Sequence, residues 1–529
     1  MRDRMTIRRI QHGEDGLRDE RGNLLPTLSR SSATIRYRDL LDTPLPTFEG
    51  STPGDPFWSR IGLTMIRTTY RAMFSTWETT GLDLIPNDRG SMCTAWHTNG
   101  VMDLSGIISI HPSHFVVGAR HDLVTRPILG FWARKFAAQP VVRKAELLRG
   151  GCTQEEADLL NGRSLLHLAS GIAAGFTCAL FPEGTSHSKS HLSDLRTGPM
   201  RTTLAAAGIA KQRDVPTPVI QPVGLHYRDR ARFRTDLWIE FGDPFEVDSH
   251  MLPESFHEAI ASGSWEEPPR EAVLELRDRV EHVLAPMTPN APDWPTHRAW
   301  QAIDATLARC KGRGDRTWRE EVIGVRGVRT VLESMESEDA ESVMDAGRAV
   351  SERLRQAGLD ARSIGLKGEL HRRPYKAAVV DGLTLALGLL MLPFILISYG
   401  PQIMIGRLLG DRTDEGVDAR TTFQFFAGMF GSLFYWPIAW MVYGGVLLAL
   451  LRTLGGWLPS TAVQWVAIAL LGLVIIVPFN LVLARIGGRA WDASVRLRTG
   501  RRRQRMRADQ GLSAALLRLE ACVRPWGTH

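Results

Sequence analysis

Cysteine is scarce in this sequence, and its spacing indicates neither a disulfide framework nor a metal site. The 529 residues include five cysteines, none in a C-x-x-C pair: Cys93, Cys152, Cys178, Cys310 and Cys522. This pattern predicts buried, reduced thiols and no bound metal. A disordered or collagen-like composition is also lacking, because hydrophobic residues make up 44% and charged residues 23% of the chain.

The N-terminus lacks the apolar run of a secretory signal peptide behind its basic residues. Residues 1–55 are rich in charge, Ser, Thr and Pro, and we expect them to form a loosely ordered arm. The net charge of +7 is modest for a chain of this length. We predict no nucleic-acid partner.

Between residues 56 and 290, apolar runs of strand length alternate with stretches of helical periodicity. The predicted strands are residues 91–96, 114–119, 139–143, 177–181, 219–226 and 237–241. Helices are predicted between them, for example at residues 127–136, 155–174 and 200–210. The alternation predicts an α/β domain with a mixed, mostly parallel sheet flanked by helices. A helical linker region, residues 291–375, follows.

Charged residues almost vanish in three later stretches. Residues 377–405 contain one, Asp381, and residues 423–451 and 463–484 contain none. Each stretch exceeds the roughly 20 apolar residues that cross a hydrocarbon layer about 30 Å thick. Residues 376–486 are therefore predicted to lie in a lipid bilayer. Pro393 favours a re-entrant or in-plane hairpin for the first stretch over a simple span.

The distribution of arginine predicts the orientation of these stretches. Nine arginines lie between Arg485 and Arg507, whereas Arg452 alone lies between the second and third stretches. By the positive-inside rule, the α/β domain and a basic tail, residues 487–529, face the cytoplasm. The chain is thus predicted to be a multi-pass membrane protein whose basic tail also suits anionic lipid headgroups.

A histidine and an aspartate follow the first predicted strand. His97 stands at its C-terminal end, on the rim of the sheet where α/β folds bind ligands, and Asp103 stands six positions later. A carboxylate that holds one ring nitrogen lets a neutral imidazole take a proton from a hydroxyl group at the other. Asp103 as a helix N-cap is the alternative interpretation.

Three more segments place functional residue types near the same rim. Pro182 and Gly184 flank Glu183 in a sharp turn after a buried strand, which is either an acid-bearing site or a structural turn. Arg143 ends another strand, where its guanidinium suits bidentate phosphate binding or an ordinary surface ion pair. Pro222 lies in a strand too apolar for chemistry, so it lines an acyl chain or belongs to the core.

In this order and spacing, the four segments resemble the motifs of the glycerolipid acyltransferases. Those motifs are a His–Asp pair, a strand with a phosphate-binding Arg, F-P-E-G, and an apolar strand with Pro. The longer H-x-N-x-x-x-D form, from His97 through Asn99 to Asp103, is similar to that of a glycerol-3-phosphate/dihydroxyacetone-phosphate acyltransferase branch. The sequence departs from the commoner third motif, F-P-E-G-T-R-S, because Ser186 and His187 replace the Arg and the Ser.

This resemblance implies a membrane-bound O-acyltransferase of phospholipid biosynthesis. The acyl donor would be acyl-CoA or acyl-carrier protein, and the acceptor glycerol 3-phosphate or 1-acylglycerol 3-phosphate (lysophosphatidic acid). His97 would be the general base, oriented by Asp103. The implied substrate-binding residues are Arg143, Glu183, Gly184, Thr185, Asn99 and Pro222, with Glu183 on a glycerol hydroxyl and Lys189 or Arg196 as further phosphate ligands. No cofactor is implied, because the thioester is already activated.

Three alternatives stay open at this point: an acyltransferase for another lysolipid acceptor, a hydrolase, and a non-catalytic membrane scaffold of the same fold. The sequence has no G-x-S-x-G motif, which argues against a serine hydrolase. A scaffold has no physical need for His97, Asp103, Arg143 and Glu183 together.

Overall fold

The computed structural model describes residues 11–13, 16–18, 34–143, 146–147, 151–250, 252–412, 417–456 and 459–527. About half of the predicted arm, residues 1–55, lies outside these ranges. Its described part contains two short antiparallel strands, β1 (Gln11–Gly13) and β2 (Gly16–Arg18), and the helix α2 (Tyr37–Leu41).

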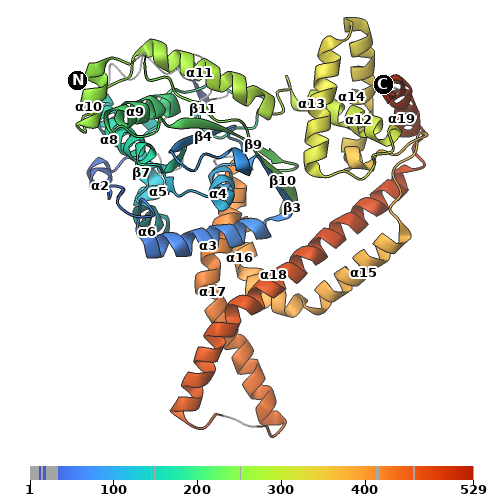
Figure 1. Cartoon of the computed structure of the whole chain (residues 1–529). Helices are drawn as coiled ribbons and strands as arrows, with labels where there is room; N and C mark the ends of the chain where they lie inside the picture. Colours follow the sequence, from blue (N-terminus) through green and yellow to red (C-terminus); the bar gives the residue numbers. More distant parts are fainter. Residues whose placement is uncertain are drawn as a thin grey trace.

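A seven-stranded sheet forms the centre of the α/β domain (Figure 1). Its strands are β3 (Phe74–Thr80), β4 (Ser91–Ala95), β5 (Phe115–Val116), β8 (Thr177–Ala179), β9 (Val219–Tyr227), β10 (Thr235–Phe241) and β11 (Phe245–Glu246). The spatial order is β3-β10-β9-β4-β8-β5, with β11 paired to β9. The β9–β10 and β9–β11 pairs are antiparallel and the others are parallel. The predicted fold class, a mixed and mostly parallel sheet flanked by helices, is confirmed.

One predicted strand is divided between two sheets. Residues 114–119 form β5 in the main sheet and β6 (Gly118–Arg120) outside it. β6 pairs in parallel with β7 (Gln139–Val141), and the backbone N–H of Gln139 also donates to the carbonyl of Val117, at 2.7 Å. β7, which ends two residues before Arg143, therefore belongs to a small two-stranded sheet, and the prediction that this strand ends at the rim of the main sheet is wrong.

Helices cover both faces of the main sheet (Figure 1). They are α3 (Pro56–Ala72), α4 (Val101–Ile110), α5 (His121–Thr125), α6 (Pro127–Lys135), α8 (Gln154–Ala173), α9 (Gly198–Gln212), α10 (Glu254–Ala261) and α11 (Arg270–Leu284). The period of two along each strand divides the core. Met92 and Ile220 pack under α8, α9 and α11, whereas Cys93 and Val223 pack against α3 and α4.

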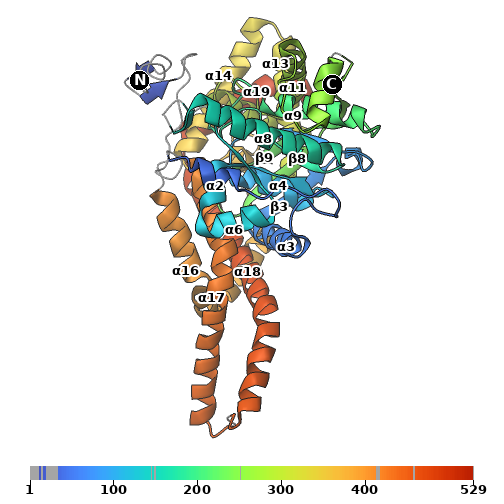
Figure 2. The same ribbon diagram turned by 90° about the vertical axis from the view of Figure 1, so that its left-hand side faces the viewer.

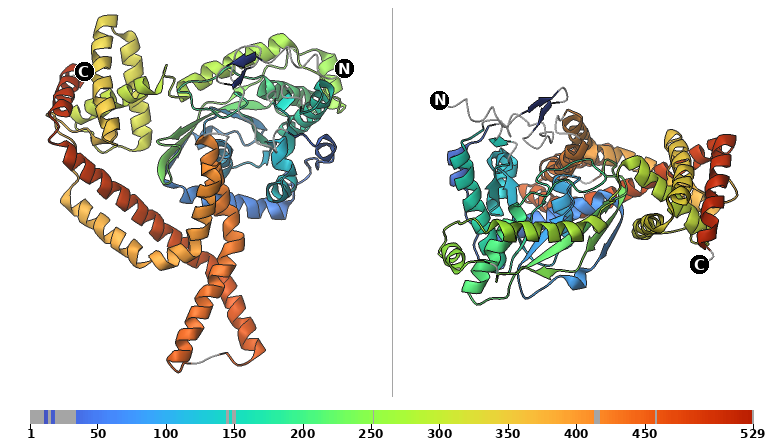
Figure 3. Two further views of the ribbon diagram at one scale, coloured as in Figure 1. Left: turned by 180° about the vertical axis from the view of Figure 1, so that it is seen from behind. Right: turned by 90° about the horizontal axis from the view of Figure 1, so that it is seen from above.

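A helical bundle lies beside the α/β domain. It combines three helices that follow the α/β domain with the last α-helix of the described chain. It consists of α12 (Trp294–Cys310), α13 (Trp318–Ser334), α14 (Ser337–Gln356) and α19 (Gln510–Val523). Ile303, Val350 and Leu519 share its core. Figure 3 shows the bundle to one side of the sheet. The expected basic tail is therefore not separate, because residues 487–506 continue a long helix and α19 packs against α12 and α14.

Four helices lie between α14 and α19: α15 (Tyr375–Leu390), α16 (Leu392–Asp411), α17 (Val417–Thr453) and α18 (Ala462–Met506). Three stretches are long and apolar enough to cross a membrane: Leu392–Asp411, Arg420–Thr453 and Ala462–Met506. Figure 2 shows α17 and α18 projecting together from the rest of the molecule. These helices indicate that the protein associates with a membrane.

The first predicted membrane segment, residues 377–405, is not one element. The chain bends between α15 and α16, just before Pro393, because proline cannot donate the hydrogen bond that would continue α15. Pro401 lies inside α16 without ending it. The second and third segments fall within α17 and α18.

Candidate active site

A short loop between β4 and α4 brings His97 and Asp103 together. Gly100, with a φ of +54°, makes the turn before α4 begins, a conformation that favours glycine. The Asp103 carboxylate then reaches back from the first turn of α4. Its Oδ2 accepts hydrogen bonds from the backbone N–H groups of Thr98 (2.9 Å) and Asn99 (2.8 Å) and lies 2.9 Å from Nδ1 of His97. The helix N-cap is Gly100, so Asp103 is not the cap.

The imidazole of His97 is held in one orientation. Its ring stacks on Phe181, with ring centroids 4.0 Å apart and planes 13° apart. Because Asp103 accepts from Nδ1, the tautomer has its proton there and Nε2 carries the lone pair. The side chain is 16% exposed and lines a cavity, so Nε2 is the atom that can meet a substrate.

A buried tyrosine and a partly buried one lie behind this pair. The hydroxyl oxygens of Tyr70, on α3, and Tyr227, on β9, are 3.2 Å apart. Burial raises the pKa of the Tyr227 hydroxyl well above its usual value, and the neighbouring Tyr70 and Asp103 raise it further. The Tyr227 hydroxyl therefore stays protonated near Asp103, and it shares a hydrogen bond with the hydroxyl of Tyr70. The sequence analysis missed them because nothing local marks a core tyrosine as a partner of a distant loop.

Glu183 connects the loop between β8 and α9 to the loop between β4 and α4. Its Oε2 accepts from the backbone N–H of His97 at 2.7 Å, and its Oε1 accepts from that of Ser193 at 2.7 Å. His187 Nε2 is 2.5 Å from the same Oε1, and the N–H of Lys189 donates to His187 Nδ1. With Nδ1 accepting, Nε2 is the protonated nitrogen and donates to Glu183. Both oxygens of Glu183 therefore accept hydrogen bonds from the protein, and a contact with a glycerol hydroxyl stays a prediction.

Side chains from distant segments clamp the two loops. Arg230 donates from its guanidinium to the carbonyls of Thr98 and His187, each at 2.7 Å. Trp294, at the start of α12, donates from Nε1 to the carbonyl of Ser188 at 2.6 Å. No local signal marked Arg230 as a partner of these loops.

The remaining predicted residues differ in their positions. Arg143, Gly184 and Thr185 line the cavity, and Arg143 Nε donates to the buried carboxylate of Glu146 at 2.7 Å. Gly184 adopts a φ of +73°, and a Cβ there would lie 3.2 Å from Cγ of Arg196. The side chain of Asn99 is buried, and its Oδ1 accepts from the hydroxyl of Thr421 on α17.

Pro222 is the exception among the predicted substrate-binding residues. It lies inside β9 opposite Thr94 of β4, and the described residues that line the cavity do not include it. Strands pair with both edges of β9, and the side chain of Pro222 is buried. Its prediction as a substrate contact is wrong, and its place is in the core.

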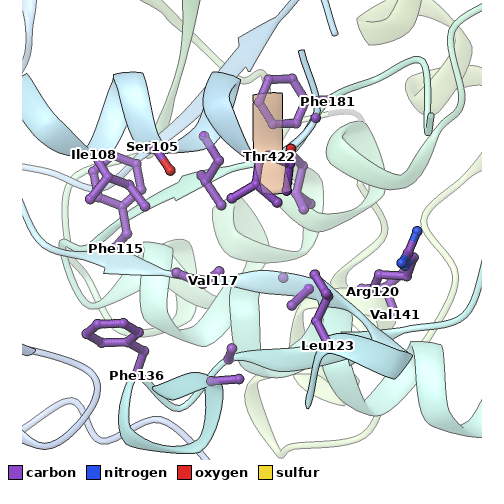
Figure 4. Close-up of a pocket in the computed structure, with 18 of the residues that line it drawn as sticks. Ser105, Ile108, Phe115, Val117, Arg120, Leu123, Phe136, Val141, Phe181 and Thr422 are labelled. Atoms are coloured by element: carbon purple, nitrogen blue, oxygen red, sulfur yellow. The ribbon is translucent and has the colours of Figure 1, made fainter. Parts of the chain in front are cut away.

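One large cavity joins these residues to the membrane helices. Its volume is about 2050 Å³, and its polar lining includes His97, Arg143, Glu183, Lys189 and Arg196. Side chains from α4, β7 and α17 meet in it, among them Ser105, Val141 and Thr422 (Figure 4). The volume exceeds the ~300–1,000 Å³ typical of small-molecule pockets, which suits two substrates bound at once.

Neither a thiolate nor a metal cluster accompanies the pair. Burial raises the pKa of the Cys93 and Cys178 thiols, so both stay protonated. Within the described ranges, no group of three or more His, Cys, Asp and Glu side chains is placed to hold a metal ion.

Comparisons with known proteins find similarity to acyltransferases. Glycerol-3-phosphate O-acyltransferase 2 of Saccharomyces cerevisiae is 31% identical over 123 residues, 23% of this chain and 15% of that protein. Glycerol-3-phosphate O-acyltransferase 1 of the same yeast is 29% identical over 167 residues, 31% of this chain and 20% of that protein. The chain thus spans a fifth or less of the length of these relatives. Over these stretches the chain is similar to the two yeast glycerol-3-phosphate O-acyltransferases.

Two further comparisons add less. An uncharacterized acyltransferase of Schizosaccharomyces pombe is 28% identical over 131 residues, 25% of this chain and 18% of that protein. Among solved structures, the 1-acyl-sn-glycerophosphate acyltransferase PlsC of Thermotoga maritima matches 41% of this chain and 80% of that chain, with 16% identity and a TM-score of 0.27, which is too low to support an argument. No family model matches the chain. The case for a glycerolipid acyltransferase relative therefore rests on the yeast sequences and on the site geometry.

Proposed function

We propose that the protein transfers a fatty acyl group from an acyl thioester to the hydroxyl of glycerol 3-phosphate or 1-acylglycerol 3-phosphate. The observation that carries this proposal is the braced His97–Asp103 pair at the polar end of a cavity that apolar side chains of α16 and α17 also line. Acyl transfer to a glycerol phosphate needs a base for a hydroxyl group and room for an acyl chain. The names of the yeast relatives support the same activity.

The reaction follows from the position of Nε2. With the acceptor hydroxyl within hydrogen-bond distance, Nε2 of His97 takes its proton as the oxygen attacks the thioester carbonyl. Asp103, at 2.9 Å from Nδ1, stabilises the imidazolium that forms. The tetrahedral intermediate then breaks its carbon–sulfur bond, and the thiolate leaves with the proton from His97. The products are an ester and a free thiol.

The acceptor phosphate is assigned to the basic residues that line the polar end. Arg143, Lys189 and Arg196 all line the cavity. Arg143 is already paired with Glu146, so a bound phosphate has to share or displace that carboxylate. This pairing, together with Ser186 in place of the motif's Arg, favours one alternative, an acyltransferase for a lysolipid acceptor with a different headgroup.

The test uses purified full-length protein in detergent or lipid. Glycerol 3-phosphate, 1-acylglycerol 3-phosphate and a lysolipid without a phosphomonoester are offered separately with radiolabelled acyl-CoA or acyl-carrier protein. We expect label in a lipid product with one of the first two acceptors and none with His97→Ala. His250→Ala, an exposed histidine of the same domain, is the matched control. No product with any acceptor and either donor contradicts the proposal.

We also propose that the α/β domain faces the cytoplasm and that α15 and α16 form a re-entrant hairpin. Figure 1 shows α15 and α16 meeting at a bend, with their other ends directed towards the bundle and the α/β domain. Asp381 of α15 pairs with Arg496 at 2.8 Å, and Asp411 of α16 pairs with Arg420, next to the catalytic loop, at 2.9 Å. Both ends of the hairpin thus lie on the side of the catalytic groups.

Accessibility of single cysteines tests this orientation. In a background without the native five cysteines, Gly50→Cys, Asp411→Cys and Gln510→Cys should react only with a cytoplasmic reagent, and Gly456→Cys only with an external one. Reaction of position 411 from outside makes α15 and α16 a true span. Reaction of position 50 from outside contradicts the cytoplasmic orientation, because the proposed water-soluble substrates lie in the cytoplasm.

A further inference from the structure

The connection between β9 and β10 carries an arginine at every second position. Residues 228–234 read R-D-R-A-R-F-R, and we call this segment the arginine loop. Arg230 and Arg234 are partly buried and bind partners in different parts of the molecule, whereas Arg232 between them is exposed. The described residues that line the cavity include no member of this loop, so it does not act on a substrate directly.

Arg230 holds the catalytic loop, residues 96–100 between β4 and α4. Its Nη1 donates to the carbonyl of Thr98 and to that of His187, each at 2.7 Å. In the same peptide group as the first carbonyl, the N–H of Asn99 donates to Oδ2 of Asp103 at 2.8 Å. A cation on the carbonyl polarises that N–H and strengthens its bond. Arg230 therefore supports the anchor of the carboxylate that orients His97.

Arg234 binds a different element, the long helix α18. Its Nε donates at 3.1 Å and its Nη2 at 2.6 Å to the carboxylate of Asp492. Both side chains are largely buried, 13% and 10% exposed, as suits a two-pronged ion pair. Asp492 lies eight residues beyond the apolar stretch 463–484, on the same continuous helix, which runs on towards the bundle (Figure 1).

The backbone on both sides is shaped for this contact. Arg234 has a φ of +58°, a conformation that residues other than glycine rarely adopt, and its N–H donates to the carbonyl of Met73 at 2.8 Å. On α18, Gly488 stands one turn before Asp492, and a Cβ there would lie 3.0 Å from Nη1 of Arg234. A strained backbone and an absent side chain thus serve the position of one guanidinium.

The arginine loop is short and bonded within itself. The N–H of Asp229 donates to Oγ1 of Thr235 at 3.0 Å, and the N–H of Ala231 donates to Oδ1 of Asp229 at 3.1 Å. Arg230 and Arg234 are only four positions apart. A displacement at one of them is therefore passed to the other.

We propose that the Arg234–Asp492 pair fixes the arginine loop to α18, and that Arg230 thereby holds the catalytic loop in its active geometry. Arg230 is then a positioning residue for the proposed acyl transfer, on which this inference rests. Catalysis depends, through these contacts, on the placement of a helix whose first part is apolar enough to cross a membrane.

The test separates turnover from binding in purified full-length protein. Palmitoyl-CoA and palmitoyl-acyl-carrier protein are offered with glycerol 3-phosphate and with 1-acylglycerol 3-phosphate. Arg230→Gln should lower kcat about 10–100-fold, because a catalytic group displaced by about 1 Å loses activity on this scale. Both KM values should stay within about threefold of wild type, since Arg230 does not line the cavity. Arg230→Lys should recover part of the loss, and Arg232→Gln, the exposed arginine of the same loop, is the matched control.

A double variant tests the connection to α18. Asp492→Asn should lower kcat about 3–30-fold, because the fork of Arg234 loses its anionic partner. If the two arginines act in series, Arg230→Gln combined with Asp492→Asn should match Arg230→Gln alone within about threefold, whereas independent effects multiply.

A milder variant keeps the test usable if loss of the buried charge prevents folding. Gly488→Ala leaves both charges in place and displaces the guanidinium, so kcat should fall about 2–5-fold. Gly500→Ala is its control, because no atom lies within 4 Å of an added Cβ there on the same helix.

Hydrogen exchange gives a readout that needs no activity. The amides of Thr98 and Asn99 should exchange faster in Arg230→Gln and in Asp492→Asn than in wild type, and at the wild-type rate in Arg232→Gln. Equal exchange in all four proteins overturns the inference.

The kinetic outcomes are equally distinct. An active wild type whose kcat is unchanged in Arg230→Gln, or losses that multiply in the double variant, overturn the inference and leave acyl transfer intact. A raised KM with unchanged kcat also overturns it, because a positioning residue acts on turnover. Absence of transfer by wild type with every substrate pair is instead the failure of the proposed function, and the exchange rates then still decide whether α18 is coupled to the catalytic loop.

Discussion

At the polar end of the cavity, the loop between β4 and α4 and the loop between β8 and α9 are held to each other by hydrogen bonds. At the other end, apolar side chains of α16 and α17 are held by packing. Asp103, Glu183 and Arg230 each bond to more than one group of these loops. Phe425 and Phe430 make their contacts through ring surfaces. A directional bond fails when one atom is removed, and a packed wall tolerates change of shape until volume is lost or gained. The two ends should therefore respond differently to mutation.

The largest effect is expected at the base. His97→Ala should lower kcat on the order of 10²–10⁴-fold, because proton removal from the acceptor then falls to water. Asp103→Asn should also lower kcat, since Nδ1 loses its anionic partner. Steady-state transfer rates and a melting curve in detergent check both. Near-wild-type turnover by folded His97→Ala contradicts the mechanism.

A smaller effect is expected for the phosphate ligand. Arg143→Ala should raise KM for the acceptor about 10–100-fold with little change in kcat, because a charge-assisted contact present in ground and transition states acts on binding. Arg143→Lys should recover only part of this loss, since an ammonium lacks the fork of the guanidinium. An unchanged KM together with a lower folding yield makes Arg143 a structural partner of Glu146, and Lys189 and Arg196 then become the residues to change.

The junction between the two ends should show an effect of a few fold. Thr421→Val removes one neutral hydrogen bond to Asn99 without changing shape, so kcat should fall about 2–10-fold. Thr453→Val, at the other end of α17, is the control. If Thr421→Val lowers only the yield of protein and leaves kcat intact, the contact does not position the catalytic loop.

The last effect is expected on stability, through two histidines that lie outside both ends of the cavity. Burial lowers the pKa of His111 and of His297 to about 4, below the usual value near 6.5. The unfolded chain binds these protons first, so stability is full above about pH 6.5 and falls as the pH decreases towards about 4. Melting temperature should drop over this window, and His111→Asn should flatten the drop. An equal slope in wild type and variant contradicts this assignment.

Sequence reasoning reached the parts of the site that are local. His97 and Asp103 share one loop, and Glu183 follows a buried strand, so residue type and spacing were enough to bring them to one rim. Arg230 and Thr421 were out of reach because their partners lie far along the chain. Arg143 was misplaced because β7 was assumed to join the main sheet.

The two environments along α17 were hidden for a different reason. An apolar side chain has the same signature in sequence whether it faces lipid, a protein core or an acyl chain. Phe425 and Leu447 both belong to a charge-free stretch, yet Phe425 is 1% exposed and Leu447 is 56% exposed. The composition could establish that the stretch is apolar, and the tertiary structure alone could divide it.

The position of α19 has a consequence for the order of synthesis. Leu512, Leu516 and Leu519 complete a core to which α12, α13 and α14 also contribute. The residues between α14 and α19 include the three candidate membrane helices of the described chain. On the ribosome, α12 and α14 emerge before the membrane helices, and their shared apolar groove stays uncovered until α19 follows. Closure of the bundle can therefore occur only after α18 has been made, and a chain that stops before α19 presents that groove to proteases and chaperones.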